Sequence, residues 1–227
     1  MLAWSRDDRW LATGTTAGDV EIWDVSEPTQ AVKQRRISEH HQPITALAFS
    51  PEGGMLASAD VGELRLWDMG GDARGDDLGR HTGLTGPTTQ LLFNASALRL
   101  FGLSDGKVRV WPIAPAGVAN RLGKAAILPS DGRIVTMAVS LDGAEIVTGD
   151  AEGLVLVWQH RGGAWKSSAG TTQGGAIVAL TLLPGRKAFL SVASDRTLSL
   201  VDFAASRRKT AQPPFYPLGP LLAKPQH

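Results

Sequence analysis

The sequence predicts an all-β protein assembled from five copies of one short unit. The first sign is a set of three similar segments: VEIWDV at 20–25, LRLWDM at 64–69 and VRVWPI at 108–113. In each segment apolar residues alternate with charged ones until a tryptophan is reached, and such alternation is typical of a β-strand. The three tryptophans, at positions 23, 67 and 111, lie at a constant interval of 44 residues. A fixed period of this length indicates a repeat protein.

Two more copies continue the series. LVLVWQH places Trp158 at the tryptophan position of a fourth unit, and LSLVDF places Val201 there in a fifth. Each unit has a second marker 18 or 19 residues upstream of this position: Trp4, Phe49, Phe93, Val139 and Leu182. The constant register of two markers makes a chance match very improbable.

Between the two markers, each unit has a third apolar run, and polar turns such as SPEGG and SLDGA precede it. This pattern predicts three consecutive strands joined by hairpin turns. A fourth, more polar segment follows the tryptophan position, for example at 31–37. No segment has the periodicity of a convincing amphipathic helix.

The second unit, HHQPITALAFSPEGGMLASADVGELRLWD, resembles a WD40 repeat. The resemblance extends over nearly the whole chain and implies a WD40-type β-propeller with about five four-stranded antiparallel blades. The expected blades cover 1–210, at approximately 1–37, 38–80, 81–122, 123–168 and 169–210. Residues 211–227 hold five prolines and are expected to form an irregular tail, because proline removes backbone donors from a strand.

In the WD40 family, a histidine before the first strand, a Ser or Thr in the second, an aspartate in the next turn and the tryptophan form a hydrogen-bonded set. The resemblance therefore implies a structural role for one group of residues: Trp23, His40, Ser58, Asp60, Trp67, Asp105, Trp111, Glu152, Trp158 and Asp195. His81 is a displaced candidate for the histidine of the third repeat.

Closure of the ring is a separate question. Met1 aligns with Ala46, which lies inside the first strand of the second repeat, so the chain begins partway into a strand. We therefore expect an open arc that lacks upstream blades of a longer chain and that self-associates or is poorly soluble. Five blades could also close on themselves, because propellers have about 4–8 blades.

The composition argues against several kinds of binding site. The formal net charge is +1, which gives no global attraction to nucleic acid or to an anionic membrane. There is no cysteine, and the neighbouring side chains of His40 and His41 point to opposite sides of an extended segment. We expect no metal and no cofactor. The charged start, MLAWSRDDRW, and the lack of an apolar run that could span a bilayer lead us to expect a cytoplasmic protein.

Two other functions remain as alternatives. A propeller hydrolase would use acidic loop residues such as Asp105 and Glu152, but GLSDG at 102–106 joins two strands and is not the strand-to-helix elbow of a serine hydrolase. A nucleic-acid-binding propeller would use basic clusters such as Arg35-Arg36. These fall in outer segments, where charge also discourages pairing with other chains.

The resemblance favours a non-catalytic scaffold that binds protein or peptide partners. The expected surface is the rim that carries the loops before each first strand and the turns between second and third strands. Seven residues are candidates for partner contacts: Asp19, Glu63, Arg80, His81, Lys107, Glu152 and Arg196.

Overall fold

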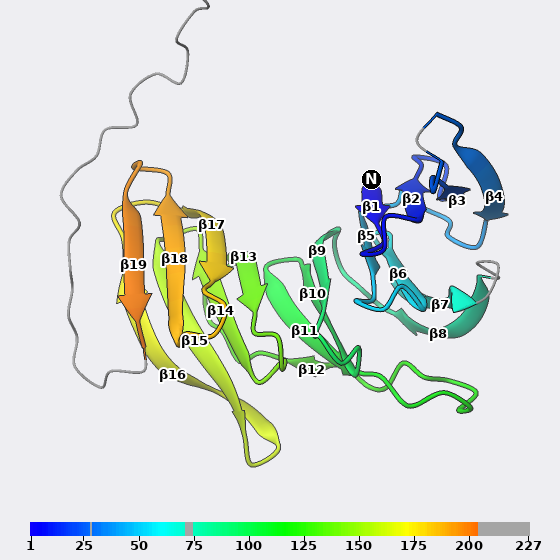
Figure 1. The fold of residues 1–227 in the computed structure, drawn as a ribbon. Coiled ribbons are helices and arrows are strands. Elements are labelled where there is room, and N and C mark those ends of the chain that lie inside the picture. The colour runs from blue at the N-terminus through cyan, green and yellow to red at the C-terminus, as the bar shows by residue number, and fades with distance from the viewer. Residues whose placement is uncertain (28, 71–74, 204–227) are drawn as a thin grey trace, which may run out of the picture.

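The computed structural model describes residues 1–27, 29–70 and 75–203 as five antiparallel sheets that follow one another along the chain. In each sheet the strands are neighbours in the order of the sequence. The connections from one sheet to the next are loops. The predicted all-β propeller architecture is confirmed (Figure 1).

The strand bounds follow the predicted units closely. The first sheet contains β1 (Leu2–Trp4), β2 (Trp10–Gly14), β3 (Val20–Asp24) and β4 (Val32–Ile37). The second contains β5 (Ala46–Phe49), β6 (Met55–Ala59), β7 (Glu63–Asp68) and β8 (Asp76–Thr82). The third contains β9 (Thr88–Phe93), β10 (Arg99–Ser104), β11 (Lys107–Pro112) and β12 (Ala126–Ile127).

The last two sheets differ in their number of strands. The fourth contains β13 (Ile134–Val139), β14 (Glu145–Asp150), β15 (Leu154–Arg161) and β16 (Ala164–Thr172). The fifth contains β17 (Ile177–Leu182), β18 (Ala188–Ala193) and β19 (Leu198–Asp202). Four sheets thus have the expected four strands, and the fifth has three within the described residues. Its expected fourth strand and the tail at 211–227 lie outside the described part of the chain.

The third unit extends further than the sequence suggested. Its outer strand β12 begins at Ala126, whereas the unit was expected to end at 122. The difference arises from a long connection after β11, which is held by an isolated bridge between Ile113 and Leu122. None of the described residues belongs to a helix that is long and apolar enough to cross a bilayer.

Each sheet has two different faces, which the strand register defines. In the second sheet, Trp67 pairs with Leu56, and Leu56 pairs with Phe49; we call this side the Trp face. Leu66 pairs with Ala57 on the opposite side, which we call the aliphatic face. The corresponding positions define the same two faces in every sheet, because side chains alternate along a strand.

The core consists of four interfaces between consecutive sheets, and all four pair the aliphatic face of one sheet with the Trp face of the next. Ala12, Val20 and Ile22 of the first sheet pack against Leu56 and Trp67 of the second. Three further clusters repeat this arrangement: the second sheet on the third, the third on the fourth, and the fourth on the fifth. One sheet cannot bury both of its faces, so the repeat is stable only as a stack.

The arc does not close. Figure 1 places β1–β4 and β17–β19 at its two ends, far from each other. Within the described residues, no strand of the first sheet pairs with a strand of the fifth. The Trp face of the first sheet and the aliphatic face of the fifth therefore have no neighbouring sheet, as expected for an open propeller.

One glycine shows how closely these interfaces are packed. Gly102 occupies the strand position that Ser58 has in the second sheet, and the Trp111 ring fills the space of the missing side chain. A Cβ atom at Gly102 would lie 2.8 Å from Cζ3 of Trp111. With no hydroxyl at this position, the buried Nε1 of Trp111 has no hydrogen-bond partner among the described residues.

We expect Gly102→Ala to lower the free energy of unfolding by about 1–3 kcal/mol, because it overpacks a filled core. The matched control is Gly54→Ala, whose Cβ would come no closer than 3.9 Å to its nearest neighbour, Cγ of Glu52. The control should change stability by no more than about 0.5 kcal/mol. Urea denaturation of both variants gives the comparison, and equal midpoints would show that Trp111 can move away from an added methyl group.

Candidate functional site

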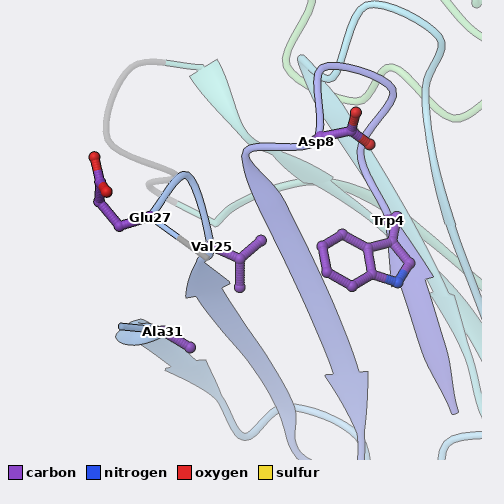
Figure 2. A pocket seen from close by; sticks show the side chains of 5 residues that line it. All are labelled: Trp4, Asp8, Val25, Glu27 and Ala31. Carbon is purple, nitrogen blue, oxygen red and sulfur yellow. The ribbon is translucent and has the colours of Figure 1, made fainter. Parts of the chain in front are cut away.

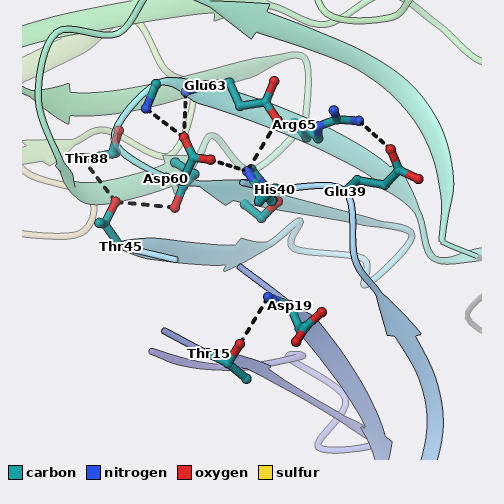
Figure 3. Close-up of polar contacts among 12 residues, drawn as sticks. Thr15, Asp19, Glu39, His40, Thr45, Asp60, Glu63, Arg65 and Thr88 are labelled. Atoms are coloured by element: carbon teal, nitrogen blue, oxygen red, sulfur yellow. Dashed lines mark hydrogen bonds and ion pairs between the residues drawn. The ribbon is translucent and has the colours of Figure 1, made fainter. Parts of the chain in front are cut away.

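The most ordered polar cluster is a buried chain of hydrogen bonds in the second sheet (Figure 3). The Trp67 Nε1–H donates to Ser58 Oγ over 2.8 Å, and Ser58 Oγ lies 2.6 Å from Nε2 of His40. Nδ1 of His40 lies 3.1 Å from Asp60 Oδ2. Asp60 Oδ1 accepts the backbone N–H groups of Gly62 and Glu63, both at 2.7 Å. The chain thus links the Trp face to the turn between β6 and β7.

The chemistry of the two ends fixes the direction of every bond. An indole N–H can only donate, and an ionised carboxylate can only accept. The Ser58 hydroxyl accepts from Trp67 and therefore donates to Nε2 of His40. His40 then carries its proton on Nδ1 and donates it to Asp60. All four groups are satisfied when His40 is neutral.

The environment favours the same protonation states. Burial lowers the pKa of His40 from its ordinary value of 6.5, and the nearby carboxylates of Asp60 and Glu63 oppose this only in part. Burial by itself would raise the pKa of Asp60, but hydrogen bonds from the backbone of Glu63 and Gly62 and from His40 hold it below its usual value. The pair is therefore a neutral imidazole beside an ionised carboxylate.

The acids and the histidine of this cluster could in principle hold a metal ion, because ligand atoms of His40, Asp60 and Glu63 lie within 4.8 Å of one another. Several of these ligand atoms already take part in hydrogen bonds. Nε2 of His40 accepts from Ser58, Asp60 binds the turn, and Glu63 Oε1 accepts from Nε of Arg65 at 2.7 Å. These bonds fix the turn, and a cation at this site would have to compete with them.

Arg65 extends the network to the outer strand. Its guanidinium lies over the Trp67 ring, 5.7 Å from the ring centroid, and Nη1 lies 3.3 Å from Asp77 of β8. Glu39 adds a contact at 3.5 Å. A buried arginine is stable only when its charge is compensated, and three carboxylates surround this one.

The other sheets keep parts of this arrangement. Trp158 donates to Thr148 Oγ1 over 2.8 Å, and Trp23 donates to Thr13 Oγ1 over 3.3 Å. In the fifth sheet, the Gln173 amide donates to the buried Ser191 hydroxyl over 3.0 Å. Gln173 therefore takes the place of His40, a substitution that the sequence analysis missed.

The acids assigned to this set are placed differently from sheet to sheet. In the fourth sheet, Asp150 occupies the position of Asp60 and accepts the backbone N–H groups of Glu152 and Leu154. The Glu152 side chain is exposed. Asp105 is also exposed and accepts from the Thr85 hydroxyl, while Asp195 binds Thr197 within its own turn.

Two sets of loops meet at one rim of the arc, and the contact is repeated four times. Each time, a backbone N–H in the loop before a first strand donates to a carbonyl in the preceding sheet's turn between second and third strands. The four bonds are Ile44 to Thr15 (3.0 Å), Leu84 to Gly62 (3.1 Å), Ile134 to Gly106 (3.0 Å) and Gln173 to Gly153 (2.9 Å). Backbone hydrogen bonds therefore join the two sets of loops at this rim.

Glycine at two of these turns permits the close approach. Gly18 and Gly153 have φ values of 89° and 91°, a region that favours glycine. A Cβ at Gly18 would lie 2.6 Å from the carbonyl oxygen of His40, and a Cβ at Gly153 would collide with the carbonyl oxygen of Gln173. The two loop sets therefore form one continuous surface, which we call the loop rim: residues 15–19, 38–45, 60–63, 83–87, 104–107, 128–133, 150–153, 173–176 and 194–196.

The candidate contact residues divide into exposed and sequestered ones. Glu152 and Arg196 are exposed at turns of the loop rim, and Lys107 is half-buried with its Nζ donating to the Ser130 carbonyl at 2.6 Å. Glu63 is held by Arg65, as described above. Arg80 and His81 lie on the outer strand β8, not in a loop.

Asp19 is buried and has two side-chain donors. Arg36 Nη2 and Ser38 Oγ each lie 2.5 Å from one of its carboxylate oxygens. The hydrogen bond from Arg36, followed by that from Ser38, lowers the pKa of Asp19. Asp19 therefore links the β2–β3 turn of the first sheet to its outer strand, β4.

Comparison with known proteins agrees with this architecture. The family model "WD domain, G-beta repeat" matches residues 2–24 and 32–68. Among solved structures, the β-propeller domain of Cps50 (Swd1) from Myceliophteria thermophila superposes with a TM-score of 0.70 at 18% identity. The match covers 95% of this chain and 69% of that domain. These two stretches thus match the WD40-repeat family, and the structural similarity over 95% of the chain shows a β-propeller fold.

The WD40 assignment confirms the resemblance drawn from the second repeat. The family match covers the first two repeats, whereas the structural similarity extends over all five. No curated protein sequence matched this chain. The WD40 fold generally serves as a scaffold for protein interactions and is typically non-enzymatic.

The histidine of this WD40 network predicts a dependence of stability on pH. Because the folded pKa of His40 is lowered, the unfolded chain binds more protons near and below pH 6.5. The contribution of neutral His40 is complete above that pH and is lost as the pH falls from 6.5 toward the lowered folded pKa. We expect the wild-type protein to lose more stability between about pH 7 and pH 5 than His40→Gln.

The variant is a suitable reference because Gln173 already makes the equivalent bond in the fifth sheet. Denaturation midpoints of both proteins across this pH range give the measurement. Other titrating groups, including His81, are common to both proteins and cancel in the difference. Parallel pH profiles would show that His40 does not titrate differently on folding.

Proposed function

We propose that this chain is a non-catalytic scaffold that binds protein or peptide partners through its loop rim. The observation that supports this most directly is the fourfold backbone contact between the two loop sets. It holds the rim in one conformation, so binding a partner would not require the loops to be ordered first.

The exposed turn residues give the rim its chemistry. The second, third and fourth sheets present Val61, Asp105 and Glu152, and the fifth presents Asp195 and Arg196. Asp131 adds another exposed acid in the loop before β13, which contacts the turn that carries Glu152 through the Ala151 N–H and the Arg133 carbonyl. The same loops also carry the exposed Arg133 and the half-buried Lys107, so a partner there would meet both signs of charge, with acidic groups in slight excess.

A cytoplasmic location is part of the same proposal. It is supported by the absence of cysteine from the sequence, which suits a reducing compartment.

Charge reversal on each rim would test the function. The wild-type protein, Asp131→Arg/Glu152→Arg and the control Glu52→Arg would be used as baits, and the captured proteins compared. Glu52 is an exposed acid in the β5–β6 turn, at the opposite rim. We expect the double variant to lose partners that the control retains. Partners kept by the double variant and lost by Glu52→Arg would place the binding surface on the other rim.

A further inference from the structure

The two uncovered faces at the ends of the arc belong to opposite types. Inside the chain, every interface pairs an aliphatic face with a Trp face. Among the described residues, no sheet covers the Trp face of the first sheet or the aliphatic face of the fifth. Each end thus has the kind of surface that the other end is built to receive.

The aliphatic face of the fifth sheet is defined by its register. Leu200 pairs with Leu190, and Leu198 pairs with Val192. Leu198 and Leu200 are 47% and 52% exposed, whereas Leu64 and Leu66, which occupy the same positions in the second sheet, are 0% exposed. The fifth sheet therefore has the apolar residues that form an interface in the second sheet, but no neighbouring sheet covers them among the described residues.

The Trp face of the first sheet is uncovered in the same way. Trp4 pairs with Leu11, which pairs with Trp23. Leu2 and Trp4 are 67% and 57% exposed, whereas their counterparts in the second sheet, Leu47 and Phe49, are buried and partly buried against the first sheet. A Lys33 ammonium lies 5.1 Å from the ring centroid of Trp23. Exposed apolar surface of this extent marks an interaction site.

A concave pocket of about 600 Å³ lies at the end of this face next to the β1–β2 turn, lined by Trp4, Asp8, Val25, Glu27 and Ala31. Figure 2 shows the Trp4 ring and the Val25 side chain on the same side of the sheet. Met69 occupies the position of Val25 in the second sheet, where it is buried against the first sheet. The pocket is thus the space that a preceding sheet occupies at every internal interface.

We propose that the chain associates head to tail, with the aliphatic face of the fifth sheet of one copy packed on the Trp face of the first sheet of a second copy. The contact repeats the packing of the four internal interfaces. It is heterologous, because it joins two different surfaces, and such contacts form either rings or open chains.

The number of sheets favours open chains. Each copy contributes five, so two copies would bring ten sheets together, more than the roughly 4–8 that close a propeller. When two copies have joined, the Trp face of one copy and the aliphatic face of the other are therefore still free. Association continues as the concentration rises and does not stop at a dimer.

Two substitutions each block one end. Trp4→Glu places a charge on the Trp face of the first sheet, and Leu200→Glu places one on the aliphatic face of the fifth. Both side chains are more than half exposed in the single chain, so the fold should tolerate them. Burying an unpaired carboxylate at the contact should weaken association more than about a hundredfold. Leu198→Glu is a second variant of the same face.

The 227-residue chain and its variants would be examined by sedimentation velocity over a wide range of concentration, with circular dichroism to verify folding. The control is Leu141→Glu, which changes a leucine that is 70% exposed in the turn between β13 and β14, away from both faces. We expect the wild-type protein and the control to form species that grow with concentration, and each blocked variant alone to remain monomeric.

The decisive sample is an equal mixture of Trp4→Glu and Leu200→Glu. The first still has an intact fifth sheet and the second an intact first sheet, so the mixture should form one-to-one dimers and nothing larger. A monomeric wild-type protein would overturn the proposal, as would association that survives both substitutions. Dimers formed by one blocked variant alone, with no complex in the mixture, would show that like faces pair instead.

Discussion

Trp67→Ala is expected to lower the free energy of unfolding by about 3–5 kcal/mol, as for other buried aromatic truncations. Trp67 is 1% exposed and packs into the interface between the first two sheets. Its removal would leave a cavity there and would also remove the donor that holds the Ser58 hydroxyl. Urea denaturation followed by circular dichroism would give the loss.

The matched control is Trp4→Ala, which removes the same side chain from the uncovered Trp face of the first sheet. Because Trp4 is mostly exposed, its truncation should cost less than about 1 kcal/mol at a protein concentration low enough to avoid self-association. Equal losses for the two variants would mean that the Trp67 side chain is no better packed than an exposed one.

Ser58→Ala should cost about 2–4 kcal/mol, because it leaves two buried polar groups without a partner. These groups are the indole N–H of Trp67 and Nε2 of His40. The change in volume is small, so the loss would come from hydrogen bonding and not from a cavity.

Ser191→Ala is the matched control for this prediction. Ser191 is equally buried and lies at the same strand position in the fifth sheet, but a single side-chain donor, Gln173, reaches it. We expect a loss of about 1 kcal/mol. If Ser58→Ala and Ser191→Ala lower the free energy of unfolding equally, the second hydrogen bond of Ser58 adds nothing to stability.

The repeat itself could be predicted from the sequence because its markers are apolar side chains at fixed strand positions. The tryptophan series located the third strand of four sheets, and Val201 located that of the fifth. The hydrogen-bonded network around His40 could be predicted because the second repeat resembles a WD40 repeat.

The remaining details depend on hairpin length and on long-range pairing. Glu152 was assigned to the set by counting back from Trp158, but the segment between the acid and the tryptophan is longer there, and Asp150, the last residue of β14, takes the place of Asp60, which directly follows β6. Asp19 was considered a free contact, yet Arg36, 17 residues later, pairs with it across the sheet. Sequence spacing does not show such a pairing.

Gln173 was missed for a chemical reason. An amide can donate to a serine hydroxyl as an imidazole can, but only the histidine is part of the familiar pattern. A search for any side chain with a donor at that position, followed by a serine in the second strand, would have found it.

The strictly consecutive pairing of strands has a consequence for how the chain folds and opens. No sheet borrows a strand from a distant part of the described chain, so every sheet can form from one continuous stretch. Such local pairing favours rapid, sequential assembly as the polypeptide leaves the ribosome. It also makes stability a sum of terms between adjacent units, as in a one-dimensional lattice. The units at the two ends then have one neighbour each and exchange their amide hydrogens first, whereas the third unit, supported on both sides, is the last to open.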